Sequence, residues 1–261
     1  MICALAACGG VDSSARVGAA AGAGEPAWPV YYLPGEHMEW EVRWAGVLFG
    51  RVQLAAGAEG RMDGTRALVV RSVASSDGAL AMFKRGSMAL TTWIDLDRAR
   101  PLAQEGSFDE IYTGEFLGGK VGAADWPRTP WQPDLGQGQT AQSSHTMLGL
   151  LRAWRPRKAG ERAVLYVRLR QRVLRLDAVA VGRERVASAV GRRDAQRIDA
   201  LATPVDGGLA PEAGQRSYPV VVWIDEATER VPVKIQIESG FGGVVELSLV
   251  TYDPPGTLAV E

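Results

Sequence analysis

Alternation of apolar and polar residues with a period of two dominates this chain. Between residues 38 and 44 every second side chain is apolar, and the side chains between them are charged. The same alternation recurs at residues 231–238 and 245–249, which a glycine-containing loop connects. Because the side chains of a β-strand point alternately to its two faces, each segment predicts a strand with one buried and one solvated face.

Shorter stretches of this kind predict further strands at residues 47–54, 67–73, 165–170, 173–181 and 197–202. Asp63-Gly64 supplies a turn signal between the first two of them. Trp93-Ile94-Asp95 and Trp223-Ile224-Asp225 each look like a strand end, followed by a short turn and a strand that begins near a proline. An aspartate side chain can cap such a turn, and proline is tolerated where a strand begins. We expect these strands to pair antiparallel.

Residues 144–154 depart from the alternation. Ser143 or Ser144 is a suitable N-cap, the apolar residues that follow have helical spacing, and Pro156 marks a stop. We predict a helix there, a weaker apolar turn at residues 80–83, and a long surface loop at residues 118–138, which are rich in Gly, Pro and Gln. The pattern as a whole predicts a mainly β protein, with a single curved antiparallel sheet or half-barrel and one covering helix near residues 143–154.

Composition favours one folded domain. Hydrophobic residues make up 46% of the chain, and the roughly 230 residues after position 27 suffice for a single β core. We divide the chain into a signal or lipobox remnant (1–8), a flexible tether (9–27), a β-rich domain (28–252) and a C-terminal tail (253–261). The tether is mostly Gly, Ala and Ser, too poor in large apolar side chains to pack. No run of about 18 apolar residues follows it, so we expect no transmembrane helix.

Leu5-Ala6-Ala7-Cys8 resembles the lipobox of bacterial lipoproteins, in which the chain is cut before the cysteine and the cysteine is acylated. The resemblance implies a lipid anchor at Cys8, and two or more acyl chains anchor stably. Gly9 stands where enteric inner-membrane lipoproteins have aspartate, which implies the outer membrane of a Gram-negative bacterium, facing the periplasm. A signal peptide needs roughly 15 residues or more. Either the initiation site lies upstream of Met1, or Cys8 is an ordinary residue.

Charge is distributed unevenly, although the net charge is only -1. Residues 152–197 contain thirteen Arg and one Lys against four acidic residues. One interpretation is that oppositely charged parts of the sheet face each other or face solvent. The other is a basic strip that contacts lipid headgroups, phosphate or acidic polysaccharide. The candidates for such an anionic surface contact are Arg168, Arg170, Arg172 and Arg175.

Residue types for catalysis or metal binding are scarce. His37 and His145 are the only histidines, and they form no pair at helical spacing. The chain has no Gly-x-Ser-x-Gly elbow and no phosphate-binding loop. Glu105, Asp109 and Glu110 could perform acid–base chemistry on a glycan, or could be solvated surface charges. We expect no catalytic residue, metal, cofactor or nucleic-acid partner, and we favour a binding protein over an enzyme.

Large apolar side chains indicate a candidate ligand site. A twisted sheet would curve its apolar face, which includes the hairpin at residues 231–249, into a trough that the helix partly covers. The candidate ligand-binding residues are Trp40, Trp44, Trp93 and Trp223 from the strands and Met147, Leu151 and Trp154 from the helix. If the helix packs down fully, these residues are only core; if it stands off, the trough can hold an acyl chain or a hydrophobic peptide. Trp126 and Trp131 in the long loop could instead stack on sugar or seat a partner.

Several motifs occur in a set order along the chain. They are Leu33-Pro34-Gly35-Glu36 with the Trp-rich strand, Gly46-Val47-Leu48-Phe49-Gly50, Trp93-Ile94-Asp95, the helix at 148–154, Gly182-Arg183-Glu184-Arg185-Val186 and the hairpin after Trp223. This order resembles the bacterial family of domain of unknown function 3108. The resemblance implies a curved antiparallel half-barrel, similar to the periplasmic lipoprotein-localisation carriers. Family members often carry an aspartate just before the helix, where this chain has Ser144-His145, so any role of that aspartate is in doubt here.

Together these features predict a lipid-anchored envelope protein with a non-catalytic binding or scaffolding β domain, for which a lipid or another hydrophobic molecule is the candidate ligand. A glycan-active envelope hydrolase or lyase and a structural assembly factor without a small ligand are the alternatives. The expected partners are the membrane, through the lipid anchor, and a lipid, a glycan or another envelope protein. Fold-level similarity alone does not decide among these functions.

Overall fold

The computed structural model describes residues 29–78, 84–112, 124–136, 138–169, 172–239 and 243–256. Of residues 84–85, 108–112 and 124–127 it describes only the backbone. Cys8, the tether at residues 9–27 and the predicted turn at residues 80–83 lie outside the described residues.

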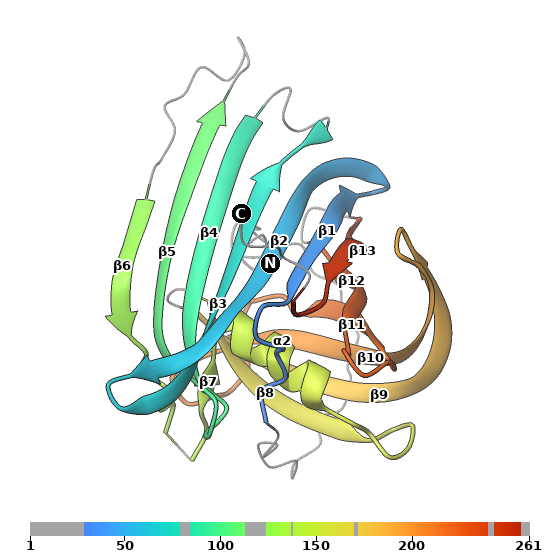
Figure 1. Cartoon of the computed structure of the whole chain (residues 1–261). Helices are drawn as coiled ribbons and strands as arrows, with labels where there is room; N and C mark the ends of the chain where they lie inside the picture. The colour runs from blue at the N-terminus through green and yellow to red at the C-terminus, as the bar shows by residue number, and fades with distance from the viewer. Residues whose placement is uncertain are drawn as a thin grey trace.

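The described residues form one large curved sheet of thirteen strands, with helix α2 (Ser144–Ala153) packed against it (Figure 1). The strands are β1 (His37–Trp44), β2 (Val47–Met62), β3 (Thr65–Ser76), β4 (Lys84–Asp95), β5 (Arg100–Tyr112), β6 (Ala124–Pro130), β7 (Ala141–Gln142), β8 (Arg162–Leu169), β9 (Arg172–Ser188), β10 (Gly191–Val205), β11 (Tyr218–Asp225), β12 (Pro232–Glu238) and β13 (Val244–Asp253). The predicted fold class is confirmed: a mainly β protein with a single curved sheet and a covering helix.

The order of strands in the sheet is β6-β5-β4-β3-β2-β1-β13-β12-β11-β10-β9-β8-β7. Consecutive strands of the chain therefore pair with each other, except β6 and β7, and β1 also pairs with β13, which joins the first and last strands. Every pair is antiparallel apart from the two-residue β7, which lies parallel to β8. The edges of the sheet are β6 and β7, which follow each other in the chain, and α2 begins directly after β7.

Helix α2 begins and ends close to the predicted positions. Ser143 is its N-cap: the Ser143 hydroxyl accepts from the backbone N–H of Thr146 (3.1 Å), and the Thr146 hydroxyl accepts from the backbone N–H of Ser143 (3.1 Å). This reciprocal capping box satisfies two backbone donors that a helix start leaves free. Trp154 is the C-cap, two residues before Pro156. No helix in the described part of the chain is long and apolar enough to cross a membrane.

The predicted surface loop at residues 118–138 is partly wrong, because residues 124–130 form the edge strand β6. Its backbone pairs with β5, for example Asp125 with Ser107 and Thr129 with Gln104. Prolines argued against a strand in the sequence, but a strand at the edge of a sheet tolerates a residue that cannot donate a ladder hydrogen bond. Residues 118–123 and residue 137 lie outside the described part of the chain.

Two of the large apolar side chains lie on the opposite face of the sheet from the one that we predicted. In both Trp-Ile-Asp segments the isoleucine points into the main core: Ile94 and Ile224 are fully buried there. Because neighbouring side chains in a strand point to opposite faces, Trp93 and Trp223 point to the convex face. Trp223 belongs to a separate convex-face cluster, and Trp93 is half-buried. The prediction that they share the trough with Trp40 is therefore wrong.

Cationic side chains cover these two convex-face tryptophans. The guanidinium of Arg128 lies 5.5 Å from the ring centroid of Trp93. Each strand next to Trp223 contributes one cation. Arg197 on β10 lies 5.7 Å and Lys234 on β12 lies 5.8 Å from the ring centroid of Trp223. A cation over an aromatic face is a stabilising contact, which explains how a large ring is accommodated on the convex face.

Candidate functional site

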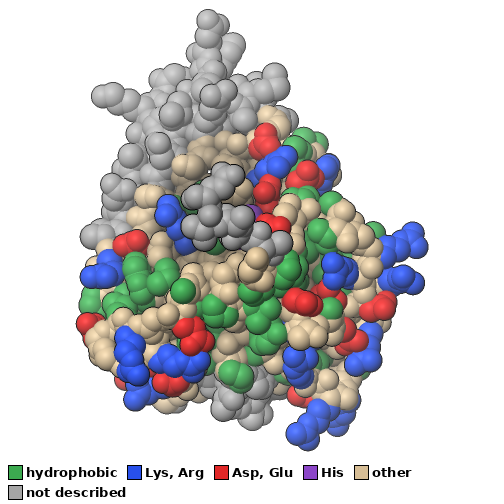
Figure 2. All heavy atoms as spheres, in the orientation of Figure 1, with side chains coloured by type: hydrophobic (Ala, Val, Ile, Leu, Met, Phe, Trp, Pro, Cys, Tyr) green, Lys and Arg blue, Asp and Glu red, His purple; other side chains and the backbone are tan. Residues whose placement is uncertain are grey.

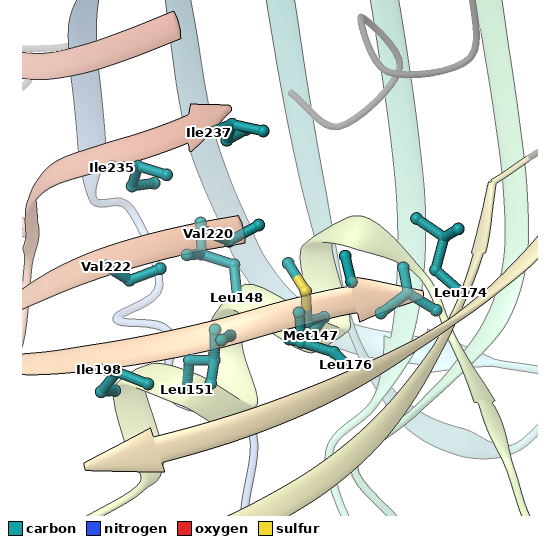
Figure 3. Close-up of a pocket in the computed structure, with 13 residues that line it drawn as sticks. Met147, Leu148, Leu151, Leu174, Leu176, Ile198, Val220, Val222, Ile235 and Ile237 are labelled. Carbon is teal, nitrogen blue, oxygen red and sulfur yellow. The ribbon is translucent and has the colours of Figure 1, made fainter. Parts of the chain in front are cut away.

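The most distinct site on the concave face is a narrow hollow between α2 and strands β8 to β12 (Figure 3). Its floor is formed by Met147, Leu148 and Leu151 from the helix, and its walls include Ile198 and Ile237. Every side chain that lines it is apolar. The free cavity volume is about 20 Å³, close to the space that one water molecule needs. The hollow is thus apolar and nearly closed in this conformation.

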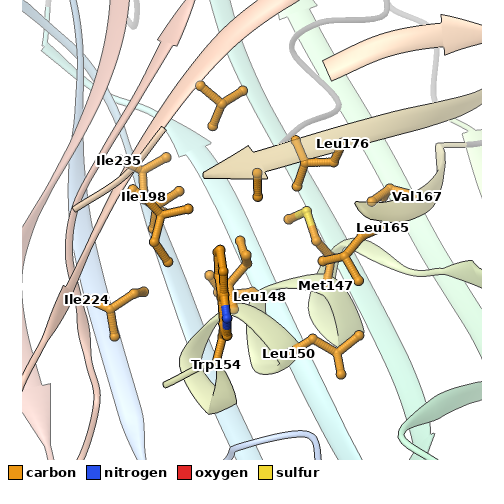
Figure 4. Packing of buried hydrophobic residues seen from close by; sticks show 14 of the residues in the cluster. Met147, Leu148, Leu150, Trp154, Leu165, Val167, Leu176, Ile198, Ile224 and Ile235 are labelled. Carbon is orange, nitrogen blue, oxygen red and sulfur yellow. The ribbon is translucent and has the colours of Figure 1, made fainter. Parts of the chain in front are cut away.

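Strand alternation and helix periodicity together produce the hollow. On β11, Val220 and Val222 line it while Val221, between them, packs on the convex face. On the helix, Met147 and Leu151 are four residues apart and therefore lie one above the other on the face toward the sheet. The surrounding side chains continue directly into the main hydrophobic core (Figure 4).

A fully buried ion pair holds the C-terminal end of α2. The Arg152 guanidinium donates to both carboxylate oxygens of Glu36, at 2.5 and 2.9 Å, and neither side chain is exposed. Arg152 also donates to the backbone carbonyls of Arg230 (2.9 Å) and Glu229 (2.7 Å). A buried ion pair of this kind is tolerated only when its remaining hydrogen-bonding groups are satisfied as well, and here the loop before β12 satisfies them.

Arg230 from the same loop caps the helix. Its guanidinium donates to the carbonyls of Arg152 (3.0 Å) and Trp154 (2.6 Å), which are among the acceptors that a helix end leaves free. Burial lowers the pKa of Arg230 to about 10, so it remains cationic at neutral pH. The sequence interpretation missed Glu36, Arg152 and Arg230 as a unit, because their partners are up to 116 residues apart in the chain.

Polar contacts also hold the N-terminal end of α2. The two ring nitrogens of His145 lie 2.9 Å from the Thr92 hydroxyl on β4 and 2.8 Å from the Ser72 hydroxyl on β3. Tyr32 donates its hydroxyl to the His145 carbonyl (2.7 Å). Burial lowers the pKa of His145 from 6.5 to about 3, so the imidazole is neutral near pH 7 and can donate from one nitrogen while it accepts at the other.

The segment before β1 covers the outer side of the helix. Tyr31 donates its backbone N–H to the Gly149 carbonyl (3.1 Å). A Cβ atom at Gly149 would lie 2.7 Å from Cε2 of Tyr32 and closer still to Val30, so only glycine permits this approach. The helix is therefore enclosed between the sheet on one side and residues 30–32 on the other.

The predicted ligand-binding residues fall into four groups, of which the first is Trp93 and Trp223 on the convex face, described above. Met147 and Leu151 line the hollow. Trp40 and Trp154 are buried in the main core, both 1% exposed, and do not line it. Trp44 is 37% exposed at the end of β1. Ile235 and Ile237 in the hollow belong to the predicted hairpin at residues 231–249. The walls that the prediction missed come from Val167 on β8 and from alternate residues of β9 to β11, whose position beside the helix depends on strand order.

The three arginines of the predicted basic strip that the structure describes do not all share one face. The β8–β9 hairpin forms, and Arg168 and Arg175 share its convex face by alternation. Arg172 lies opposite Leu169, whose side chain is in the main core, and so belongs to the other face. Arg175 is bonded to Asp177 (2.8 Å), and Arg170 lies outside the described residues.

Other arginines of the basic segment pair with acidic residues elsewhere in the sheet. Arg183 lies 2.7 Å from Glu226, and Arg193 lies 2.9 Å from Asp225. On the face shown in Figure 2, charges of both signs are mixed. These contacts support the interpretation that oppositely charged parts of the sheet face each other.

The residues considered for chemistry are only partly described, and those that are described contact different partners. In the described residues no group of three or more His, Cys, Asp and Glu could hold a metal ion. Glu105 is half-buried on β5, while the side chains of Asp109 and Glu110 lie outside the described part. His37 is bonded to Asp253 (3.2 Å), at the opposite end of β1 from Trp44.

The two loop tryptophans differ in what the structure describes. Trp131 is half-buried and donates its indole N–H to the Ala141 carbonyl (2.8 Å), so its ring folds back onto the chain that leads to β7. The side chain of Trp126 lies outside the described residues.

Comparison with known proteins yields a family match and distant structural similarity. The family model described as protein of unknown function DUF3108 matches residues 39–250. A β-barrel-like protein of domain of unknown function DUF1849 from Brucella abortus aligns over 87% of this chain and 100% of its own, with 11% identity and a TM-score of 0.48. A lipoprotein candidate from Parabacteroides distasonis aligns over 87% and 97%, with 8% identity and a TM-score of 0.33. A candidate exported protein with a YmcC-like fold from Bacteroides fragilis aligns over 87% and 100%, with 10% identity and a TM-score of 0.36. Among curated proteins, none matches this chain.

Loss of the Glu36 carboxylate should destabilise the fold strongly. Glu36→Gln leaves the Arg152 cation buried without its counterion, and we expect the free energy of unfolding to fall by about 3–5 kcal/mol in urea denaturation. The double variant Glu36→Gln/Arg152→Met should recover part of this loss, because it leaves no unpaired charge. The matched control is Glu59→Gln, which breaks the exposed pair with Arg66 and should cost less than about 1 kcal/mol. A Glu36→Gln protein as stable as the control would contradict this role.

His145 should make stability depend on pH in acid. Unfolded histidine takes up a proton as the pH falls below about 6.5, whereas folded His145 does so only near pH 3. Its contribution is complete above pH 6.5 and is lost toward pH 3, by up to about 1.4 kcal/mol per pH unit. His145→Gln should remove that slope between pH 6 and pH 4, about the range in which only the unfolded histidine titrates, when unfolding is measured across that range. The control His37→Gln alters a half-exposed histidine and should keep it. An unchanged slope in His145→Gln would refute the assignment.

Proposed function

The chain belongs to the DUF3108 family of proteins of unknown function. For this member of the family, we propose that the β domain binds a hydrophobic molecule, such as the acyl chain of a lipid, against the concave face of the sheet. The observation that carries the proposal is the hollow between α2 and β8–β12, whose lining is apolar throughout. Binding sites for apolar ligands are concave and mostly apolar. An enzyme acting on glycans would instead need polar groups converging on a cleft.

The small free volume of the hollow defines how a ligand would be accommodated. A cavity of about 20 Å³ cannot take an acyl chain without rearrangement. Met147 in the floor is the adaptable residue, because methionine is unbranched and repacks readily. The ends of α2 are fixed by Arg152 and His145, so the ligand is expected to displace side chains and leave the helix in place.

We further propose that the protein is anchored to the periplasmic side of the outer membrane through acylated Cys8. The support is the sequence alone: the lipobox-like Leu5-Ala6-Ala7-Cys8, the following Gly9, and the Gly/Ala/Ser-rich residues 9–27. A tether of this composition would span roughly 20–25 Å on average. Such a reach places the β domain close to the bilayer, where lipid ligands are available.

Filling the hollow should abolish binding of an apolar probe. Ala200 on β10 is half-buried and lines the hollow, so Ala200→Phe puts a large ring where the ligand would lie. We expect the affinity for a dansyl-labelled fatty acid, measured by fluorescence titration, to fall by about tenfold or more, since several buried methylenes are lost to the ligand.

The matched control places the same ring on the other face of the sheet. Val221→Phe on β11 enlarges a half-buried residue of the convex-face cluster and should leave probe affinity unchanged. If the unaltered protein binds no fatty acid, or if Ala200→Phe binds as well as Val221→Phe does, the proposal fails.

The lipid anchor is tested separately from the ligand. With an upstream signal peptide supplied, Cys8→Ser should prevent incorporation of radiolabelled palmitate and move the protein from the membrane to the soluble fraction. Cys3→Ser, the matched control at the only other cysteine, should change neither. Unaltered protein that takes up no palmitate would show that Cys8 is not an acylation site.

A further inference from the structure

One cross-strand row of apolar side chains leads from the hollow to the end of the sheet. Ile237 on β12 lies opposite Val245 on β13, Val245 lies opposite Trp44 on β1, and Trp44 lies opposite Val47 on β2. Residues directly opposite each other in an antiparallel pair share a face of the sheet. Since Ile237 lines the hollow, the row extends the apolar wall of the hollow along the concave face.

Exposure rises steadily along this row. Ile237 is 3% exposed, Val245 is half-buried, Trp44 is 37% exposed and Val47 is 54% exposed. Val244, next to Val245, is 38% exposed, but it alternates to the other face, where it lies opposite Glu238. We call Trp44 and Val47 the rim; they are two of the four exposed large apolar side chains in the described residues.

The β1–β2 turn presents the rim at the tip of a hairpin (Figure 1). Ala45 and Gly46 both have positive φ, 47° and 82°, as the two central residues of a tight type I′ turn require. Trp44 and Val47 flank this turn directly. Arg43 alternates to the other face, where it donates to Glu41 (3.0 Å) and to the Gly46 carbonyl of the turn (3.2 Å). The rim therefore consists of two uncharged side chains beside an arginine that is paired with Glu41.

The size of the rim favours a bilayer over a protein partner. Two partly exposed side chains offer less than about 300 Å² of apolar surface, whereas a stable protein interface buries about 800 Å² on each partner. A few side chains suffice, however, for shallow insertion, and tryptophan favours the boundary between headgroups and acyl chains.

We propose that the rim formed by Trp44 and Val47 docks on a lipid bilayer, and that the row from Val47 to Ile237 guides an acyl chain between the bilayer and the hollow. The guiding role rests on the proposed binding function; the docking role does not. Because the rim is apolar and uncharged, docking is expected on neutral vesicles and is insensitive to salt.

The test uses the full chain with Cys8→Ser, so that no acyl anchor contributes, in flotation with phosphatidylcholine vesicles. Val47→Ser should lower partitioning by about fivefold, and Val47→Ser with Trp44→Ser by about tenfold or more, from the apolar surface removed. Val181→Ser is the matched control, because Val181 is also an exposed apolar residue, 44% exposed, and lies on β9, which three strands separate from β13 in the sheet. It should change partitioning by less than about twofold. Far-UV circular dichroism checks that the variants fold. If the variant that contains Trp44→Ser does not fold, the single variant Val47→Ser still tests the proposal, because Val47 is half-exposed.

Three outcomes would contradict docking of the rim on a bilayer. Equal partitioning of the rim variants and Val181→Ser overturns the proposal. So does partitioning that needs anionic phosphatidylglycerol and disappears at high salt, which would indicate a charged face instead. A dimer in analytical ultracentrifugation that Val47→Ser dissociates, without vesicle binding, would assign the rim to a second copy of the chain. Ala200→Phe should still bind vesicles, because it alters the hollow and not the rim. Failure of the ligand-binding proposal can therefore be distinguished from failure of the bilayer-docking proposal.

Discussion

The buried ion pair between Glu36 and Arg152 is the interaction on which the position of α2, and with it the floor of the hollow, depends. It joins the segment before β1 to the last turn of the helix, and the same guanidinium reaches the carbonyls of the loop before β12. Three parts of the chain that are far apart in sequence therefore meet at one charge. Separating the pair would leave an unpaired ion in the core, which is far costlier than replacing both partners. The contact thus specifies one position of the helix against the sheet.

Alternation made much of the fold predictable from sequence. The strands around Trp40, Ile235 and Leu247 have one apolar and one polar face, and the structure places all three side chains in the main core. Ser143 and Pro156 marked the limits of α2 for the same local reasons that operate in the structure. The edge strand β6 was not predictable in this way, because its prolines are tolerated only at an edge, and edge position is a property of the whole sheet.

The candidate site was less predictable, because it depends on register and long-range pairing. Because Trp93 and Trp223 are large and apolar, we expected them to point inward. Pairing with the neighbouring strands decides which alternate side chains of each strand face the core, and in both strands these include the isoleucine, Ile94 or Ile224. Met147 and Leu151 were identified because helical periodicity is local. The strand walls that face them come from β9 to β12, and no local pattern states which strands will lie over a helix. The same holds for the polar anchors of α2, whose partners are distant in sequence.

The contrast between polar helix ends and an apolar helix middle limits what the hollow can accept. Displacing the whole helix would unpair Glu36 and Arg152, at a cost of several kcal/mol. Burial of a methylene group returns about 0.8 kcal/mol, so roughly the first four to six methylenes of an acyl chain would only offset that cost. Moving the Met147 side chain breaks no hydrogen bond or ion pair and needs only rotamer changes. A ligand that enters by this route must be slender enough to pass between α2 and the strands, which favours a single flexible chain over a bulky ring system.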